Sequence, residues 1–514
     1  MKTLYSYLFL ILIFSCQEKA LEGKMDYRSI KISDGSISGK LVGEDSIKTF
    51  MGIPFAAPPV GEFRWKSPQP VTPWEGIKQC VENPASSIQN PPVPFFAWSE
   101  EFLIPPSPIS EDCLYLNVWT DAEGAQEKRP VMVWVHGGGF SGGSGTVPLY
   151  DGEELAKKGI VVVTINYRLG ALGFLAHPEL SKESESGTSG NYGILDQIAA
   201  LNWVKKNIAA FGGDPDNVTI AGQSAGSMSV NALVGSPLAK GLFNKAIAQS
   251  GAMFNYDGGR SVRNIEMAED AGVAFMEKVG ASSISELRNM PADSILVAGG
   301  GFWPYKDDYV IPVNFDENFK SGIANQINLL TGWNADDNVS FGPPMTPEEF
   351  KAQAVEKYED KAASYLELFP ANTPEELEET RSTLAELVFG YQNYTWARIQ
   401  SELSPGSSYV YYFTRVPPGE PNYGAFHSAE FSYAFNTLKY WDRPFTETDY
   451  KLEQITSNYW VNFVKRGNPN GEDLAIWPSF NPDDPMVMEL GDQVQPIKPP
   501  HLEQIQFMQE IHYK

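Results

Sequence analysis

The chain has 514 residues, of which 42% are hydrophobic and 12 are tryptophan, enough apolar material for one large core. Its formal net charge of −25 argues against a protein that binds nucleic acid or docks on anionic lipid, because both surfaces favour clustered lysine and arginine. A well-solvated acidic surface is the simpler interpretation of that charge.

The N-terminus predicts an exported protein. Lys2 is followed by a nearly all-apolar run over residues 4–14, which is short for a membrane span. The run leads into Ile-Phe-Ser-Cys, which places Cys16 where a bacterial lipoprotein is cleaved and lipidated; an ordinary cleaved signal is the alternative. We expect a leader over 1–15, a tether over 16–27, a single domain over 28–514, and membrane attachment through Cys16 facing the periplasm or the cell exterior.

Two further cysteines follow, Cys80 and Cys113. In an oxidising compartment a disulfide between them is the natural expectation, and two separate buried thiols are the alternative. A metal site is not expected, because two cysteines without a nearby histidine cannot complete one.

Continuous apolar runs in the centre of the chain predict strands buried on both faces of a parallel sheet. These runs cover residues 131–135, 160–165, 217–221, 246–248, 327–331 and 409–413. Apolar residues at helical spacing occur between 191 and 211, a helix is expected near 449–466, and helices dominate from 260 to 400. The alternation predicts an α/β fold with a large, mostly parallel central sheet, helices on both faces and helical insertions.

A nucleophile elbow is predicted at residues 222–226, Gly-Gln-Ser-Ala-Gly, between the strand 217–221 and a helix that begins at Ala225. The small neighbours permit a strained turn, and the helix N-terminus favours developing negative charge near Ser224. Residues 139–143 also match this pattern, but no helix former follows them, so Ser141 is interpreted as a loop residue. The hypothesis is acyl transfer through Ser224.

A serine nucleophile needs a neighbouring base, and the chain has five histidines. His501 and His512 lie in the polar C-terminal tail. His177 precedes a proline, as is typical of a turn, and His136 begins a glycine loop. His427, after the late strand 409–413, remains as the candidate base, with a buried structural histidine as the alternative.

The base in turn needs a carboxylate to fix its tautomer. The strand 327–331 leads into Asp336 and Asp337, and the ends of parallel strands are where such an acid belongs. The chain order Ser, Asp, His agrees with this placement, and both aspartates stay open at this point.

An oxyanion requires backbone N–H donors. The run 136–140, His-Gly-Gly-Gly-Phe, follows the strand 131–135 and offers amides that no side chain covers. A phosphate-binding loop is disfavoured because no Gly-Lys-Ser/Thr follows.

Together these segments resemble the type-B carboxylesterase family, which includes the cholinesterases and belongs to the α/β-hydrolase superfamily. The similarity extends over nearly the whole chain after the leader. It includes residues 52–56, 110–117, 166–170, 211–215, 459–463 and 467–470.

The resemblance implies Ser224 as nucleophile, His427 as base, and the amides of Gly138, Gly139 and Ala225 as the oxyanion hole. It also supports the Cys80–Cys113 bridge. The family's acid aligns with Asp337, where this chain has Asp in place of Glu, and Asp336 is kept as the alternative acid. Gln223 stands where the family usually has Glu, which removes a negative charge near the imidazolium and argues against choline esters.

We therefore expect a serine carboxylic-ester hydrolase that acts through an acyl-enzyme on uncharged carboxylic esters of small molecules, without a metal or other cofactor. An esterase for acetylated or feruloylated glycans is one alternative, and a non-catalytic cholinesterase-like binding protein is another.

Overall fold

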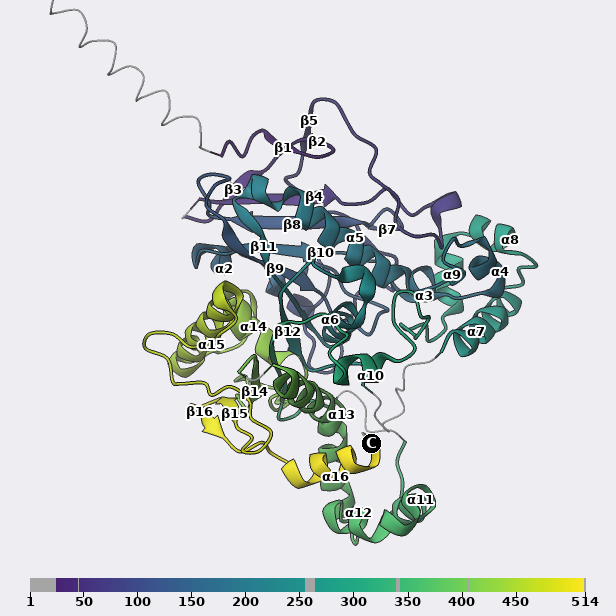
Figure 1. The fold of residues 1–514 in the computed structure, drawn as a ribbon, viewed down its shortest axis with the longest axis vertical. Helices are drawn as coiled ribbons and strands as arrows, with labels where there is room; N and C mark the ends of the chain where they lie inside the picture. The colour runs from purple at the N-terminus through teal and green to yellow at the C-terminus, as the bar shows by residue number, and fades with distance from the viewer. Residues whose placement is uncertain (1–24, 45, 255–263, 339–342, 405, 513–514) are drawn as a thin grey trace, which may run out of the picture.

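The structure is a computed structural model that describes residues 25–44, 46–254, 264–338, 343–404 and 406–512 (Figure 1). Its centre is an eleven-stranded mixed sheet with the order β16-β15-β14-β13-β12-β11-β9-β10-β8-β4-β3. The strands in that order are β16 (Val494–Ile497), β15 (Val487–Leu490), β14 (Ser408–Phe413), β13 (Asn328–Asn334), β12 (Lys245–Gln249), β11 (Gly213–Gln223), β9 (Arg129–Val135), β10 (Val161–Ile165), β8 (Tyr115–Thr120), β4 (Ile47–Pro54) and β3 (Lys40–Val42).

The seven strands from β15 to β10 pair in parallel, and antiparallel strands flank them at both ends. Each predicted central strand is present, within a few residues of its expected ends. The parallel run matters for function because the carboxyl ends of all its strands meet at one edge of the sheet.

Alternate residues of β9 face opposite sides of the sheet, as strand geometry requires. Val131 and Val133 belong to the same core as α5 (Tyr192–Asn207) and α6 (Ala225–Gly235). Met132 and Trp134 instead belong to the core that includes α2 (Glu153–Lys157), α14 (Ala429–Phe435) and α15 (Glu447–Arg466). Helices therefore cover both faces, as predicted, and the strand is apolar throughout because neither face meets water.

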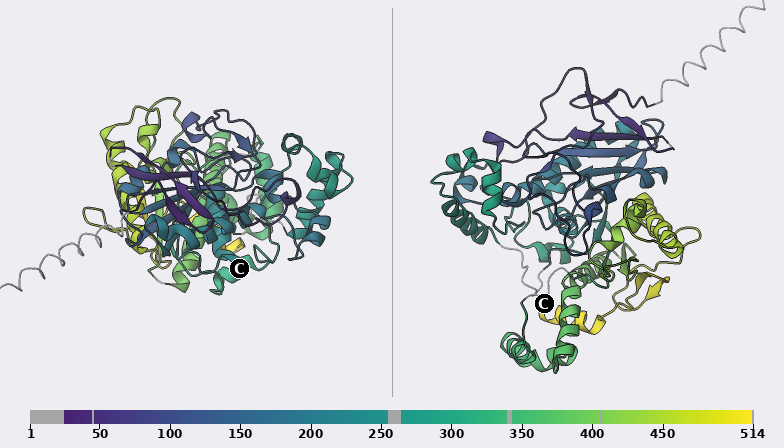
Figure 2. Two further views of the ribbon diagram at one scale, coloured as in Figure 1. Left: turned by 90° about the horizontal axis from the view of Figure 1, so that it is seen from above. Right: turned by 180° about the vertical axis from the view of Figure 1, so that it is seen from behind.

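Helices inserted between the strands form two outlying groups (Figures 1 and 2). One group, beside α3 and α4, contains α7, α8 and α9; the other, around the long helix α13, contains α11, α12 and α16. The bounds of these helices and of α10 are α3 (Gly170–Phe174), α4 (Pro178–Glu183), α7 (Ile265–Lys278), α8 (Ile284–Asn289), α9 (Ala292–Ala298), α10 (Phe315–Lys320), α11 (Pro347–Tyr358), α12 (Ala362–Leu368), α13 (Pro374–Leu403) and α16 (Leu502–His512).

Two small sheets outside the central one are built from residues 30–110. They are formed by β1 (Ile30–Ile32), β2 (Gly35–Ser38) and β5 (Ile77–Gln79), and by β6 (Ser86–Ser87) and β7 (Ile109–Ser110). No helix among the described residues combines the length and the apolar character needed to cross a bilayer. The predicted leader and Cys16 lie outside the described residues.

The expected Cys80–Cys113 disulfide is a wrong prediction for this structure, which holds both residues as free, buried thiols. Burial raises the pKa of each thiol to about 12, so both stay protonated. The prediction was drawn from the number of cysteines, their compartment and the family resemblance. None of these fixes the direction of a side chain, which a disulfide requires.

Candidate active site

Ser224 occupies a strained turn between β11 and α6. Its φ of 58° and ψ of −124° lie outside the regions that L-residues normally adopt. The turn is tight on both sides: a Cβ on Gly226 would stand 2.0 Å from the carbonyl oxygen of Val135, and one on Gly222 would stand 2.5 Å from that of Gly226. The small residues at both positions are therefore a steric requirement, and α6 begins at Ala225 as predicted.

His427 and Asp337 meet across the sheet edge from loops that follow β14 and β13. The Nδ1 atom of His427 donates to Oδ1 of Asp337 over 2.5 Å, and both side chains are almost wholly buried. The second carboxylate oxygen of Asp337 accepts the backbone N–H of Asn334 at 3.0 Å. Phe389 of α13 stacks on the imidazole with ring centroids 4.6 Å apart. These contacts hold the ring as the Nδ1–H tautomer.

The neighbouring aspartate makes a different contact. Asp336 accepts the backbone N–H of Ala425 at 2.7 Å through its Oδ2. This contact joins the two loops that carry Asp337 and His427. Of the two acids that the sequence left open, the structure thus sets Asp337 against His427.

The other ring nitrogen bonds to Gln223, which the family resemblance already placed near the imidazole; the hydrogen bond itself was not predicted. His427 Nε2 accepts a hydrogen bond from the side-chain amide of Gln223 at 3.1 Å. Ser224 lines the same pocket as His427, yet in the described part of the chain its Oγ forms no hydrogen bond, to the ring or to any other group. Catalytic hydrogen bonds are often formed only when substrate is present.

The predicted oxyanion amides surround this serine. Gly138, Gly139 and Ala225 line the pocket with Ser224, and none of their N–H groups has an acceptor among the described residues. Gly138 and Gly139 have φ values of 103° and 60°, and a Cβ on Gly138 would stand 2.2 Å from the carbonyl oxygen of Gly142. The glycines are therefore needed for the loop's conformation, and the unbonded amides can receive an anionic oxygen.

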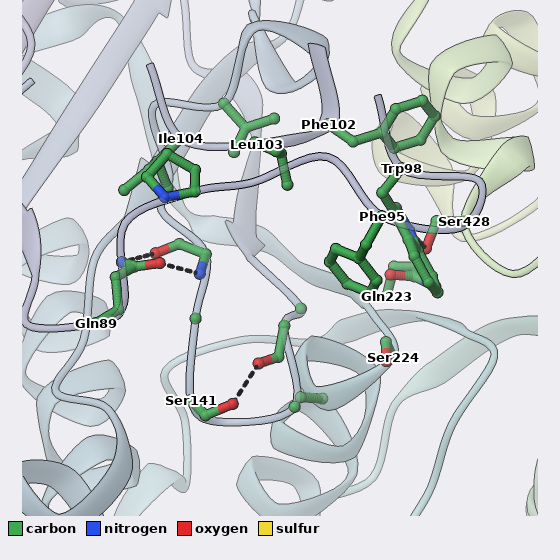
Figure 3. A pocket seen from close by; sticks show the side chains of 18 of the residues that line it. Gln89, Phe95, Trp98, Phe102, Leu103, Ile104, Ser141, Gln223, Ser224 and Ser428 are labelled. Atoms are coloured by element: carbon green, nitrogen blue, oxygen red, sulfur yellow. Dashed lines mark hydrogen bonds between the residues drawn. The ribbon is translucent and has the colours of Figure 1, made fainter. Parts of the chain in front are cut away.

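Gln89 holds one end of this glycine loop (Figure 3). Its amide donates to the carbonyl of Gly143 at 2.8 Å and accepts the N–H of the same residue at 2.8 Å, as a backbone strand would. At the other end the Tyr167 hydroxyl donates to the carbonyl of His136 at 2.9 Å, and the two rings stack. The sequence gives no signal for Gln89, because 54 residues separate it from its partner.

The remaining histidines lie elsewhere. His177 caps α4 by accepting the N–H of Glu179, and His501 lies 3.3 Å from Glu386. His136 is buried at the start of the glycine loop, where burial lowers its pKa to about 4 and keeps the ring neutral.

The pocket above Ser224 has a volume of about 520 Å³ and a largely apolar wall (Figure 3). Its aromatic lining residues are Phe95, Trp98, Phe102, Tyr150, Trp303 and Phe431. No Asp, Glu, Lys or Arg of the described chain lines it, and no cluster of His, Cys, Asp and Glu among those residues has the arrangement of a metal site. Phe95 is 61% exposed and Val93 is 68% exposed, so both form the mouth of the pocket.

One buried carboxyl group lies beneath the site. Glu430 of α14 is fully buried and accepts amide N–H groups from Gln249 at 3.0 Å and Asn334 at 2.7 Å. Burial and then the charge of Asp337 raise the pKa of Glu430.

The fold and the site together define an α/β-hydrolase: a mixed, mostly parallel sheet with helices on both faces, a serine at a strand–turn–helix elbow, and a His–Asp pair at the same sheet edge. The sequence profile described as "Carboxylesterase family" matches residues 26–508, and the chain belongs to that family. It is a carboxylic ester hydrolase.

Three relatives illustrate the similarity. The chain is 35% identical to fumonisin B1 esterase of Sphingopyxis macrogoltabida, over 89% of this chain and 86% of that protein. It is 34% identical to para-nitrobenzyl esterase of Bacillus subtilis (strain 168), over 91% and 96%. Among solved structures, a thermophilic pNB esterase is 32% identical with a TM-score of 0.81, covering 94% of this chain and 100% of that one.

Proposed function

We propose that this esterase hydrolyses uncharged carboxylic esters through an acyl-enzyme formed on Ser224. The observation that carries the proposal is the buried hydrogen bond between His427 and Asp337 beside a strained serine and a row of unbonded amides. Each part supplies what acyl transfer requires: a nucleophile, a base of fixed tautomer and donors for the oxyanion.

The reaction proceeds in two halves. Ser224 Oγ attacks the ester carbonyl carbon while its proton passes to Nε2 of His427, and the carbonyl oxygen becomes an anion bound by the oxyanion amides. The bond to the alcohol oxygen then breaks, and that oxygen takes the proton from Nε2. A water molecule, deprotonated by the same nitrogen, next attacks the acyl carbon, and the acid leaves as Ser224 recovers its proton.

The preference for uncharged esters is supported by the pocket wall. No Asp, Glu, Lys or Arg among the described lining residues can pair with a charged substrate group and so offset the free-energy cost of its desolvation. The aromatic rings favour apolar acyl or alcohol groups. Two relatives are named as esterases for different substrates, fumonisin B1 and a p-nitrobenzyl ester.

Covalent labelling tests the mechanism. A p-nitrophenyl alkylphosphonate is expected to inactivate the protein and to add its mass to Ser224. Ser224→Ala should abolish labelling and lower kcat for p-nitrophenyl butyrate by about 10⁴-fold or more. Ser141→Ala is the matched control, because that serine also stands in a G-x-S-x-G sequence, and it should keep labelling. Activity that survives Ser224→Ala would contradict the proposal.

A matched pair of substrates tests the charge preference. Butyrylthiocholine and 3,3-dimethylbutyl thiobutyrate have the same shape and differ in one positive charge. The uncharged ester is expected to have a kcat/KM at least tenfold higher. Acetylated and feruloylated glycans complete the panel, and a preference for either would assign the pocket to sugar-linked esters instead.

We also propose that the protein is exported and lipidated at Cys16, supported by the leader pattern of the sequence. Lipid attached to the wild-type protein and absent from Cys16→Ser, measured by intact mass spectrometry of the membrane fraction, is the expected result. An unmodified mature protein in both would contradict it.

A further inference from the structure

Gln223 is the last residue of β11, is 2% exposed, and immediately precedes Ser224. Its side-chain amide lies 3.1 Å from Nε2 of His427, the atom that exchanges protons in the proposed reaction. Figure 3 shows the two neighbours Gln223 and Ser224 at the pocket floor. The nitrogen that must accept the serine proton therefore already has a hydrogen-bonding partner.

The direction of this hydrogen bond follows from the proton inventory. Asp337 accepts the Nδ1 proton, so the neutral ring carries its lone pair on Nε2. Only the NH₂ end of the Gln223 amide can bond to that lone pair. Its oxygen then faces Gly137, where a Cβ would stand 3.1 Å from that oxygen, so the missing side chain leaves room for it.

An N–H donor at this position distinguishes between the two forms of the ring. It bonds to the neutral imidazole, but a proton on Nε2 would set two N–H groups against each other. No carboxyl group among the described residues bonds to Nε2: Asp337 bonds to Nδ1, and Glu430 of α14 interacts with the ring by charge only. Glu386 of α13 contacts Trp333 and His501. The other ring neighbours, Phe389 and Trp98, are uncharged.

We propose that the Gln223 amide holds the imidazole of His427 in its neutral form and thereby extends ester hydrolysis to lower pH. The proposal rests on the proposed function, because it concerns the base of the same reaction. Gln223 touches the reacting nitrogen, so removing its donor changes the pH profile and not only the stability of the fold.

The test compares pH profiles of kcat/KM for p-nitrophenyl butyrate. Gln223→Met is nearly isosteric and has no N–H donor, and Gln223→Glu replaces the donor with an acceptor of a proton. The midpoint of the acid limb is expected to rise by about 0.4–1 pH unit in the Met variant, the equivalent of one net hydrogen bond. The rise should be larger in the Glu variant, because a carboxylate favours the imidazolium.

Three controls isolate the effect. Gln79→Glu adds the same charge on exposed β5 and should leave the profile unchanged. Glu430→Gln, combined with Gln223→Met, should keep the shift, which excludes titration of Glu430 as its source. Stoichiometric phosphonate labelling of Ser224 at the high-pH plateau shows that each variant is folded. If the Met variant is not labelled, Gln223→Leu, which also has no N–H donor, replaces it.

An acid limb that stays in place or moves to lower pH in the variant without the donor would overturn the proposal. If the wild-type enzyme is active and is labelled at Ser224, such a result for the variant leaves the proposed function intact. A wild-type protein that is neither active nor labelled refutes the proposed function instead.

Discussion

The substitution Asp337→Asn tests whether this carboxylate acts in the reaction or only in the stability of the fold. Asp337 accepts two N–H donors, from His427 on Oδ1 and from the backbone of Asn334 on Oδ2. Asparagine offers one oxygen and one NH₂ group in nearly the same volume, so one of the two donors must face another donor.

The ring and the backbone respond differently to that conflict. The Asn334 N–H cannot give up its proton, and leaving it unpaired in a fully buried place costs about 1–3 kcal/mol. The imidazole can instead move its proton from Nδ1 to Nε2. The amide oxygen therefore turns toward Asn334, and Nε2 carries a proton where a lone pair is needed.

We expect kcat to fall by about 10³–10⁴-fold, which corresponds to about 4–5.5 kcal/mol of transition-state stabilisation, while KM and the thermal midpoint change little. Initial rates with p-nitrophenyl butyrate and a melting curve measure both. Asp336→Asn is the matched control and should stay within about threefold, because its amide oxygen can still accept the Ala425 N–H. A larger loss in Asp336→Asn, or less than tenfold in Asp337→Asn, refutes this reasoning.

Three further variants test other parts of the structure. Gln89→Leu removes both hydrogen bonds to Gly143 and should lower kcat by about 10–100-fold at similar KM. The reason is that the oxyanion loop stabilises the transition state and not the bound substrate. An unchanged kcat would show that the loop keeps its conformation without Gln89. Gly226→Ala places a methyl 2.0 Å from a carbonyl oxygen and should lower the thermal midpoint sharply, whereas Gly301→Ala, with open space around it, should not. Burial raises the pKa of Glu453 to about 7, so its contribution to stability is complete below pH 4.5 and is lost as pH rises through 7. Glu453→Gln should therefore reduce, by about 1–2 kcal/mol, the fall in unfolding free energy between pH 5 and 8 measured by denaturant titration.

Local sequence patterns predicted the central strands, the turn at Ser224 and the glycine loop. The apolar runs predicted the central strands because a strand covered on both faces must be apolar throughout. The elbow and the glycine loop are equally local: their glycines are fixed by clashes within the turn or with the adjacent strand. The choice of His427 also needed little more than the scarcity of histidine in the chain.

Contacts between distant segments had no such signature. Gln89 bonds to a residue 54 positions away, and nothing near it in the sequence indicates that partner. Gln223 bonds to a residue 204 positions away, and only the family resemblance placed it near the imidazole. The wrong disulfide has the same origin, because counting cysteines does not show where the side chains point.

The sequence by itself determined the reaction class, since backbone sterics and residue chemistry are encoded within a few positions of Ser224. Only the tertiary structure shows which of Asp336 and Asp337 contacts His427 and which side chain bonds to Nε2 of that ring. Both outcomes depend on where the loops after β13 and β14 come to rest against β11, and that is set by packing across the whole sheet edge.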